Sequence, residues 1–117
     1  DVLTFHCPLT PETRGIINRR TLSLMKPTAL LINTARGGIM DEVAVADALH
    51  AGVIAGAGID VQVKEPMAAD NPLLTAPHCI LTPHIAWAPF ETRVRLIDRV
   101  AENLSAFQNG NPINTVI

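Results

Sequence analysis

A regular alternation of two kinds of segment limits the possible folds of this chain more than any other feature. Short apolar runs bounded by turn residues alternate with longer segments whose apolar residues recur at spacings of three and four. Strand-sized runs that alternate with amphipathic helices are typical of βαβ units, in which the strands pair in parallel. The sequence therefore predicts an α/β fold with about four strands in one parallel sheet and helices flanking it.

Four segments have the length and composition of strands: residues 2–5, 29–33, 53–61 and 79–82. The first ends at a turn that contains Pro8, because proline cannot continue a ladder of backbone hydrogen bonds. The second is continuously apolar, which predicts a central strand that is covered on both faces.

Three segments predict helices. Residues 19–25 would form a short helix after Asn18, and residues 42–51 a longer one that Asp41 caps. The third would begin at Pro89 and end before Gly110, and its apolar residues recur along one stripe: Val94, Ile97, Val100, Ala101, Leu104 and Phe107. Residues 62–78 form a long loop, and loops of that length in compact domains are usually functional.

Charge and composition exclude several classes of partner. The net charge is -2, and no run of basic residues exceeds the pair Arg19 and Arg20, so we expect neither nucleic acid nor a membrane surface as a partner. We expect a small-molecule substrate instead. Two cysteines, Cys7 and Cys79, are too few for a disulfide framework, which favours a reducing compartment, the cytoplasm by default.

No metal site is predicted. Three of the four histidines lie at no metal-ligand spacing from one another or from either cysteine: His6, His50 and His78. We interpret them as structural or surface residues.

The carboxyl ends of parallel strands meet at one edge of a sheet, and ligands of doubly wound folds bind there. The segments that follow the four predicted strands are 6–9, 34–38, 60–65 and 83–87. We therefore expect these four segments to lie together at one edge and to carry any chemistry.

Three residues in these segments could perform catalysis, and each also has a structural interpretation. Arg36 precedes two glycines and could grip a substrate carboxylate in bidentate fashion, or equally pair with Asp41 or Glu42. His84 is an imidazole of the kind that exchanges protons near neutrality, although a lone histidine after a strand is more often structural. Glu65 would be an ordinary surface carboxylate unless it meets His84 across the loop.

Five motifs in order resemble the NAD(P)-dependent D-2-hydroxyacid dehydrogenases. They are HCPLT at 6–10, NTARGG at 33–38 with DE at 41–42, GAGIDV at 56–61 with EP at 65–66, NPL at 71–73, and TPH at 82–84. The resemblance implies a Rossmann-type sheet, of which this chain is the second half. A departure from the family pattern is Gln62, where many relatives carry an aromatic residue.

The resemblance also implies roles. His84 would give a proton to a keto oxygen while hydride arrives from NADH or NADPH, Glu65 would pair with His84, and Arg36 would hold the substrate carboxylate. From the residues alone, Asp60 is better explained as a backbone cap; the resemblance implies that it meets the cofactor. The residues that the resemblance assigns to NAD or NADP are Cys7, Pro8, Thr34, Ala35, Arg36, Asp60, His84, Ile85 and Ala86.

The segment His84-Ile85-Ala86-Trp87 resembles the glycerate dehydrogenase (hydroxypyruvate reductase) branch of the family. The expected reaction is thus the reduction of hydroxypyruvate or glyoxylate. The alternative within the same fold is a corepressor that binds the dinucleotide without turnover. Formate dehydrogenases of this fold carry Gln where Glu65 stands, which argues against that activity.

No G-x-G-x-x-G turn is present, and Asp1 leads directly into the first strand without an initiating methionine. We therefore expect residues 1–108 to be the C-terminal half of a dinucleotide-binding domain, and 109–117 a tail that returns to a substrate domain. By itself this piece would be inactive, and its first strand would form an unprotected edge. The full-length protein is expected to be a homodimer.

Overall fold

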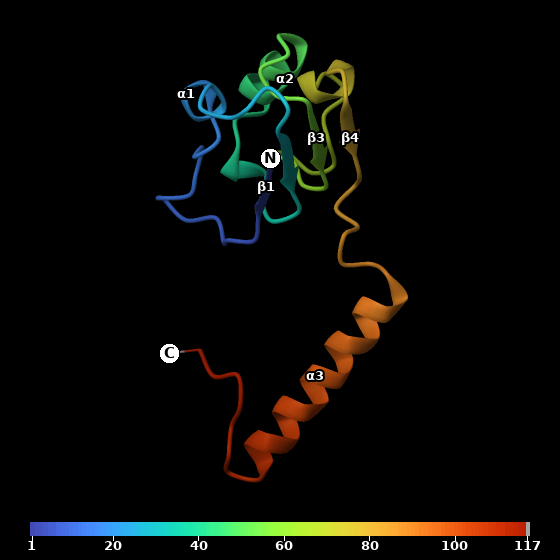
Figure 1. Cartoon of the computed structure of the whole chain (residues 1–117). Coiled ribbons are helices and arrows are strands. Elements are labelled where there is room, and N and C mark those ends of the chain that lie inside the picture. Colours follow the sequence, from blue (N-terminus) through green and yellow to red (C-terminus); the bar gives the residue numbers. More distant parts are fainter. Residues whose placement is uncertain (117) are drawn as a thin grey trace. The chain divides into compact units, whose positions relative to one another are not determined.

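The computed structural model describes residues 1–116 and separates into two compact units (Figure 1). The first comprises Asp1–His84, and the second begins at Ile85. The predicted boundary at residue 108 refers to the domains of a longer parent chain and stays a prediction. Residue 117, the last residue of the predicted tail, lies outside the described residues.

The first unit is built on one sheet of four parallel strands, as the alternation of segments predicted. The strands are β1 (Val2–Phe5), β2 (Leu30–Asn33), β3 (Gly56–Ile59) and β4 (Cys79–Leu81), in the spatial order β1-β2-β3-β4. Their register places Phe5 level with Asn33, and Asn33 level with Ile59. The four carboxyl ends therefore meet at one edge, as expected.

The third strand is shorter than the predicted run 53–61. The backbone N–H of Val53 donates to the carbonyl of Ala48 at 2.8 Å, which keeps Val53 in the turn after the preceding helix. Gly52 adopts φ +66° in this turn, a backbone conformation that glycine adopts without steric cost. Strand pairing accordingly starts only where Ala55 donates to the carbonyl of Ala29.

The helices of the first unit are α1 (Arg19–Leu22) and α2 (Glu42–His50), with 3-10 turns η1 (Gly37–Ile39) and η2 (Pro72–Thr75). Asp41 caps α2, because its Oδ1 accepts a hydrogen bond from the backbone N–H of Ala44 at 3.1 Å. Asn18 caps α1, which ends at Leu22, with Ser23 as its C-cap residue, rather than at residue 25. Bonds of the i to i+3 type tighten the chain there, from Leu24 to Thr21 and from Met25 to Leu22.

The core lies on one face of the sheet, where α2 packs against the inner strands. Leu31 of β2 is fully buried, and Val45 and Leu49 of α2 belong to the same apolar cluster. The prediction that the second strand is covered on both faces is wrong, because Leu30, on the opposite face, is 42% exposed. The continuous apolar run marks an inner strand of the sheet, whose two faces differ in burial.

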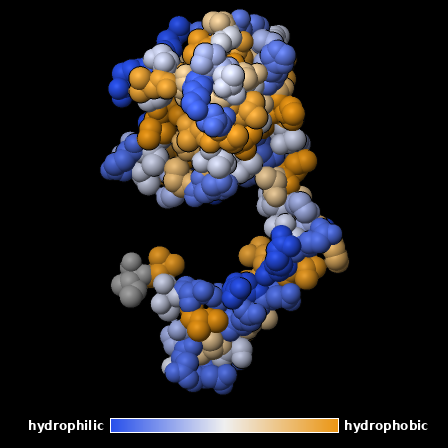
Figure 2. All heavy atoms as spheres, in the orientation of Figure 1, coloured by the Kyte–Doolittle hydropathy of each residue, from blue (hydrophilic) through white to orange (hydrophobic). Residues whose placement is uncertain are grey.

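The second unit contains α3 (Phe90–Gln108), which Pro89 precedes as the N-cap residue. Gly110 follows the helix with φ +74°, consistent with its predicted role as a stop signal. The stripe residues Val94, Ile97, Val100, Leu104 and Phe107 are between 40% and 71% exposed. Figure 2 shows apolar atoms on the surface of both units. No helix among the described residues is long and apolar enough to cross a membrane.

Candidate active site

Arg36, Glu65 and His84 line the same hollow, of about 340 Å³, at the carboxyl edge of the sheet. Arg36 comes from the segment after β2, Glu65 from the loop after β3 and His84 from the segment after β4. Parallel pairing brings these three segments together although they are far apart in the sequence. The structure therefore groups the three residues that the sequence singled out separately.

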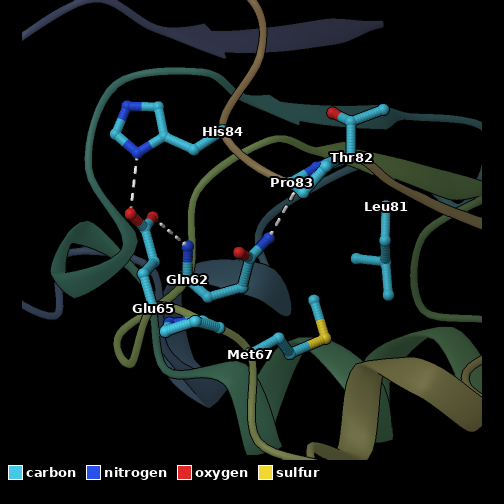
Figure 3. A pocket seen from close by; sticks show the side chains of 8 residues that line it. Gln62, Glu65, Met67, Leu81, Thr82, Pro83 and His84 are labelled. Atoms are coloured by element: carbon cyan, nitrogen blue, oxygen red, sulfur yellow. Dashed lines mark hydrogen bonds and ion pairs between the residues drawn. The ribbon is translucent and has the colours of Figure 1, made fainter.

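His84 and Glu65 form a direct pair (Figure 3). Nδ1 of the imidazole lies 2.7 Å from Oε2 of the carboxylate, and the two side chains are 39% and 36% exposed. The His84 backbone is held by a hydrogen bond of 2.8 Å from its N–H to the carbonyl of Asp60. His84 also adopts φ +56°, a conformation that is uncommon outside glycine and that clusters at functional sites.

The second oxygen of Glu65 is also held. Oε1 accepts a hydrogen bond of 3.0 Å from the backbone N–H of Gln62. The hydrogen bond with His84 and then that from Gln62 lower the pKa of the Glu65 carboxyl from its ordinary value, because both favour the ionised form. An ionised carboxylate only accepts hydrogen bonds, so Nδ1 of His84 carries the shared proton. Nε2 is then the ring nitrogen with which a substrate would exchange a proton.

Arg36 is exposed, and its Nη1 donates to the carbonyl of Ala35 at 2.6 Å. Neither acid proposed as its structural partner forms an ion pair with it among residues 1–116. Asp41 caps α2, and Glu42 accepts hydrogen bonds from other groups. Of the two interpretations that the sequence left open, the structure does not support the ion pair.

Two residues that the sequence reasoning did not assign hold the Arg36 segment in place. Asn33 is fully buried; its Nδ2 donates to the carbonyl of Arg36 at 3.0 Å, and its Oδ1 accepts from the N–H of Ala35. A Cβ atom added to Gly37 would lie 2.0 Å from the backbone carbon of Gln62. Two features of the sequence could have identified these residues: an Asn at the end of an apolar run, and the pair of glycines after Arg36.

Asp60 is 3% exposed, and its Oδ1 accepts a hydrogen bond of 2.5 Å from the hydroxyl of Thr82. Its carbonyl accepts the backbone N–H of His84. Asp60 therefore joins the ends of β3 and β4. Its contact with a cofactor stays a prediction.

A second hollow of about 620 Å³ lies at the carboxyl ends of β1 and β2. Its lining includes five of the residues predicted to contact a cofactor: Cys7, Pro8, Thr34, Ala35 and Arg36. Its volume is within the range of small-molecule sites, and its position is that of ligand sites in doubly wound sheets. Ile85 and Ala86, also predicted as cofactor contacts, belong to the second unit.

Metal-ligating groups are not clustered in the part of the chain that the structure describes: no three His, Cys, Asp or Glu residues lie close enough to share an ion. Cys7 and Cys79 are both unbridged. Burial raises the pKa of the Cys79 thiol, which disfavours the reactive thiolate.

Residues 1–86 match the family model described as "D-isomer specific 2-hydroxyacid dehydrogenase, NAD binding domain". A hydroxypyruvate reductase from Blautia hydrogenotrophica is 48% identical over 116 residues, which is 99% of this chain and 36% of that protein. A glycerate dehydrogenase from Methylorubrum extorquens is 48% identical over 118 residues, 99% of this chain and 38% of that protein.

Among solved structures, an NADPH-dependent glyoxylate/hydroxypyruvate reductase from Sinorhizobium meliloti, in complex with NADP and sulfate, aligns with a TM-score of 0.83 and 30% identity. The alignment covers 100% of this chain and 38% of that one. The chain thus spans less than two-fifths of the length of these relatives.

Proposed function

This chain belongs to the family of NAD-binding domains of D-isomer specific 2-hydroxyacid dehydrogenases, and from that premise we propose that its protein reduces a small 2-keto acid with NADH or NADPH. The favoured substrates are hydroxypyruvate and glyoxylate, which relatives at 48% identity are named for. The observation that carries the proposal is the 2.7 Å pair of His84 and Glu65 in one hollow with Arg36.

The hollow of Cys7, Pro8, Thr34 and Ala35 fits the nicotinamide side of such a cofactor. It lies at the strand ends and shares Arg36 with the hollow of His84 and Glu65, so a ligand in one would border a ligand in the other. When bound, the reduced nicotinamide supplies the hydride that the keto carbon receives.

His84 supplies the proton in this reaction. Its Nδ1 proton is engaged by Glu65, so Nε2 faces the substrate and gives a proton to the keto oxygen as the carbon is reduced. Glu65 orients the ring and stabilises the imidazolium that precedes the transfer. In the reverse direction the same nitrogen accepts the proton of the hydroxyl group.

Arg36 holds the substrate carboxylate. Its planar guanidinium matches a carboxylate in bidentate geometry, which fixes the orientation of the neighbouring keto group. Asn33 and Gly37 fix the backbone on either side of Arg36, so its side chain extends from a defined position.

A steady-state assay tests the proposal on the protein at the length that its gene encodes. The expected result is oxidation of NADH or NADPH that depends on hydroxypyruvate or glyoxylate. Binding of NADH, followed by fluorescence, is measured in parallel. Retained binding without turnover of either acid would contradict the proposal and would instead support a corepressor-like dinucleotide sensor.

A further inference from the structure

Glu42, the first residue of α2, contacts the loop that carries Glu65 through both of its carboxylate oxygens. Oε1 accepts a hydrogen bond of 2.8 Å from the backbone N–H of Val63, and Oε2 accepts one of 3.0 Å from Nδ2 of Asn71. Val63 precedes Glu65 in the chain and Asn71 follows it. One side chain thus holds the loop on both sides of the residue that pairs with His84.

The bond with Asn71 has a fixed direction. Asn71 is buried, and its Oδ1 already accepts a hydrogen bond of 2.9 Å from the backbone N–H of Leu73. Its Nδ2 must therefore be the group that faces Glu42. A carboxylate can accept from both Asn71 Nδ2 and the N–H of Val63, whereas an amide at position 42 has one accepting oxygen and would leave one of these two donors facing its NH2 group.

Two carboxylates hold two successive backbone amides at this point. The N–H of Gln62 donates to Glu65, and the next N–H, that of Val63, donates to Glu42. Gly37 lies against the same peptide group, since a Cβ added there would meet the backbone nitrogen of Val63 at 2.4 Å. The segment 36–42 and the loop 62–71 are therefore fixed to each other directly beside the candidate site.

We propose that Glu42 is a positioning residue that sets the spacing between Arg36 and the pair of Glu65 and His84. The inference rests on the proposed function for its kinetic consequence, but its structural consequence can be measured without turnover. A negative charge in the first turn also favours the helix dipole, so the test must separate that effect from positioning.

An exchange of donor and acceptor provides the test. In Glu42→Gln the one amide oxygen can replace only one of the two carboxylate oxygens, so either Val63 N–H or Asn71 Nδ2 loses its acceptor. In Asn71→Asp two carboxylates face each other, so each single variant loses one of the two bonds. The double variant restores it with the roles reversed and the same net charge. The double variant carries no charge in the first turn of α2, so its recovery separates positioning from the helix dipole. Asp47→Asn controls for the loss of an acid elsewhere in the same helix, at an exposed position where the carboxylate pairs with Arg19.

The first readout is the titration of the Glu65 carboxyl, followed by NMR with ¹³C-labelled glutamate. Each single variant should raise the pKa of Glu65 towards its ordinary value, because a mobile loop weakens the bonds from His84 and Gln62. The second readout is turnover of hydroxypyruvate, where we expect kcat/KM to fall by about tenfold to a hundredfold, as for other small misplacements. The double variant should recover both.

Loss of stability alone, with an unchanged Glu65 titration and unchanged kcat/KM in the single variants, would overturn the inference. So would a double variant that fails to recover the titration while Asp47→Asn behaves like the unchanged protein. If the unchanged protein turns over neither acid, the proposed function fails, and the Glu65 titration still decides the role of Glu42.

Discussion

At the scale of single residues, the candidate site depends on a close backbone contact that only glycine allows. Gly37→Ala would place a methyl group 2.0 Å from the backbone carbon of Gln62, so the two segments must separate. We expect a loss of about 1–3 kcal/mol in the free energy of unfolding, typical of overpacking, measured by urea denaturation. Gly38→Ala is the control, because its added carbon meets the flexible side chains of Leu9 and Arg14 and no backbone atom among its nearest neighbours. Equal effects at both positions would contradict this account.

Glu65 links the site to pH. Its folded-state pKa is lowered, so its stabilising contribution is fully present above the ordinary pKa of a glutamate, about 4.3, and is lost as the pH falls through the lowered value. The variant Glu65→Gln lacks this contribution at every pH. The difference in the free energy of unfolding between the wild-type protein and the variant should therefore shrink as the solution is acidified below about pH 4. Asp70→Asn, an exposed change in the same loop, serves as the control. A difference that is constant from pH 6 to pH 2 would argue against the pair.

At the scale of elements, α2 depends on its cap. Asp41→Ala removes the acceptor of the Ala44 N–H and should cost about 1 kcal/mol in the free energy of unfolding. Asp41→Ser keeps a capping oxygen and should cost much less. Thermal and urea unfolding of both variants would measure the difference, and equal losses would mean that the cap bond contributes nothing.

The elements themselves could largely be predicted from the sequence, because strands and helices differ in local periodicity. Runs such as 2–5 and 42–51 have strong local signals, and the structure confirms both elements within a residue. The late start of β3 and the early end of α1 could not be predicted, because Val53 and Ser23 are placed by turn hydrogen bonds that leave no periodic pattern. The exposed face at Leu30 depends on tertiary packing, which a continuous apolar run does not specify.

The candidate site was predictable to the extent that chemistry follows strand ends. Arg36 and His84 follow strands directly, so parallel pairing alone brings their segments to one edge. The role of Glu42 was not predictable. As a sequence signal it is an acid in a first helical turn, whereas its partners Val63 and Asn71 lie in a loop whose path no local pattern describes.

At the scale of the whole molecule, the 117-residue chain exposes apolar surface on both units. Val2 and Ile80, on one face of the sheet, are 62% and 72% exposed, and β1 is an edge strand. Exposed apolar surface and open strand edges both promote association. We expect the weight-average mass of this chain to rise with concentration in sedimentation experiments, and Val2→Lys to reduce that rise. A monodisperse monomer that melts cooperatively would show that this prediction is wrong.

The central claim is that His84, oriented by Glu65, supplies the proton for reduction of a 2-keto acid. The most direct test is the single-turnover rate of NADH oxidation by hydroxypyruvate, with the protein at the length that its gene encodes and with His84→Asn beside it. Loss of a general acid should slow this step by about a hundredfold to ten-thousandfold while NADH binding is retained. A His84→Asn protein that transfers hydride at the unchanged rate would contradict the account.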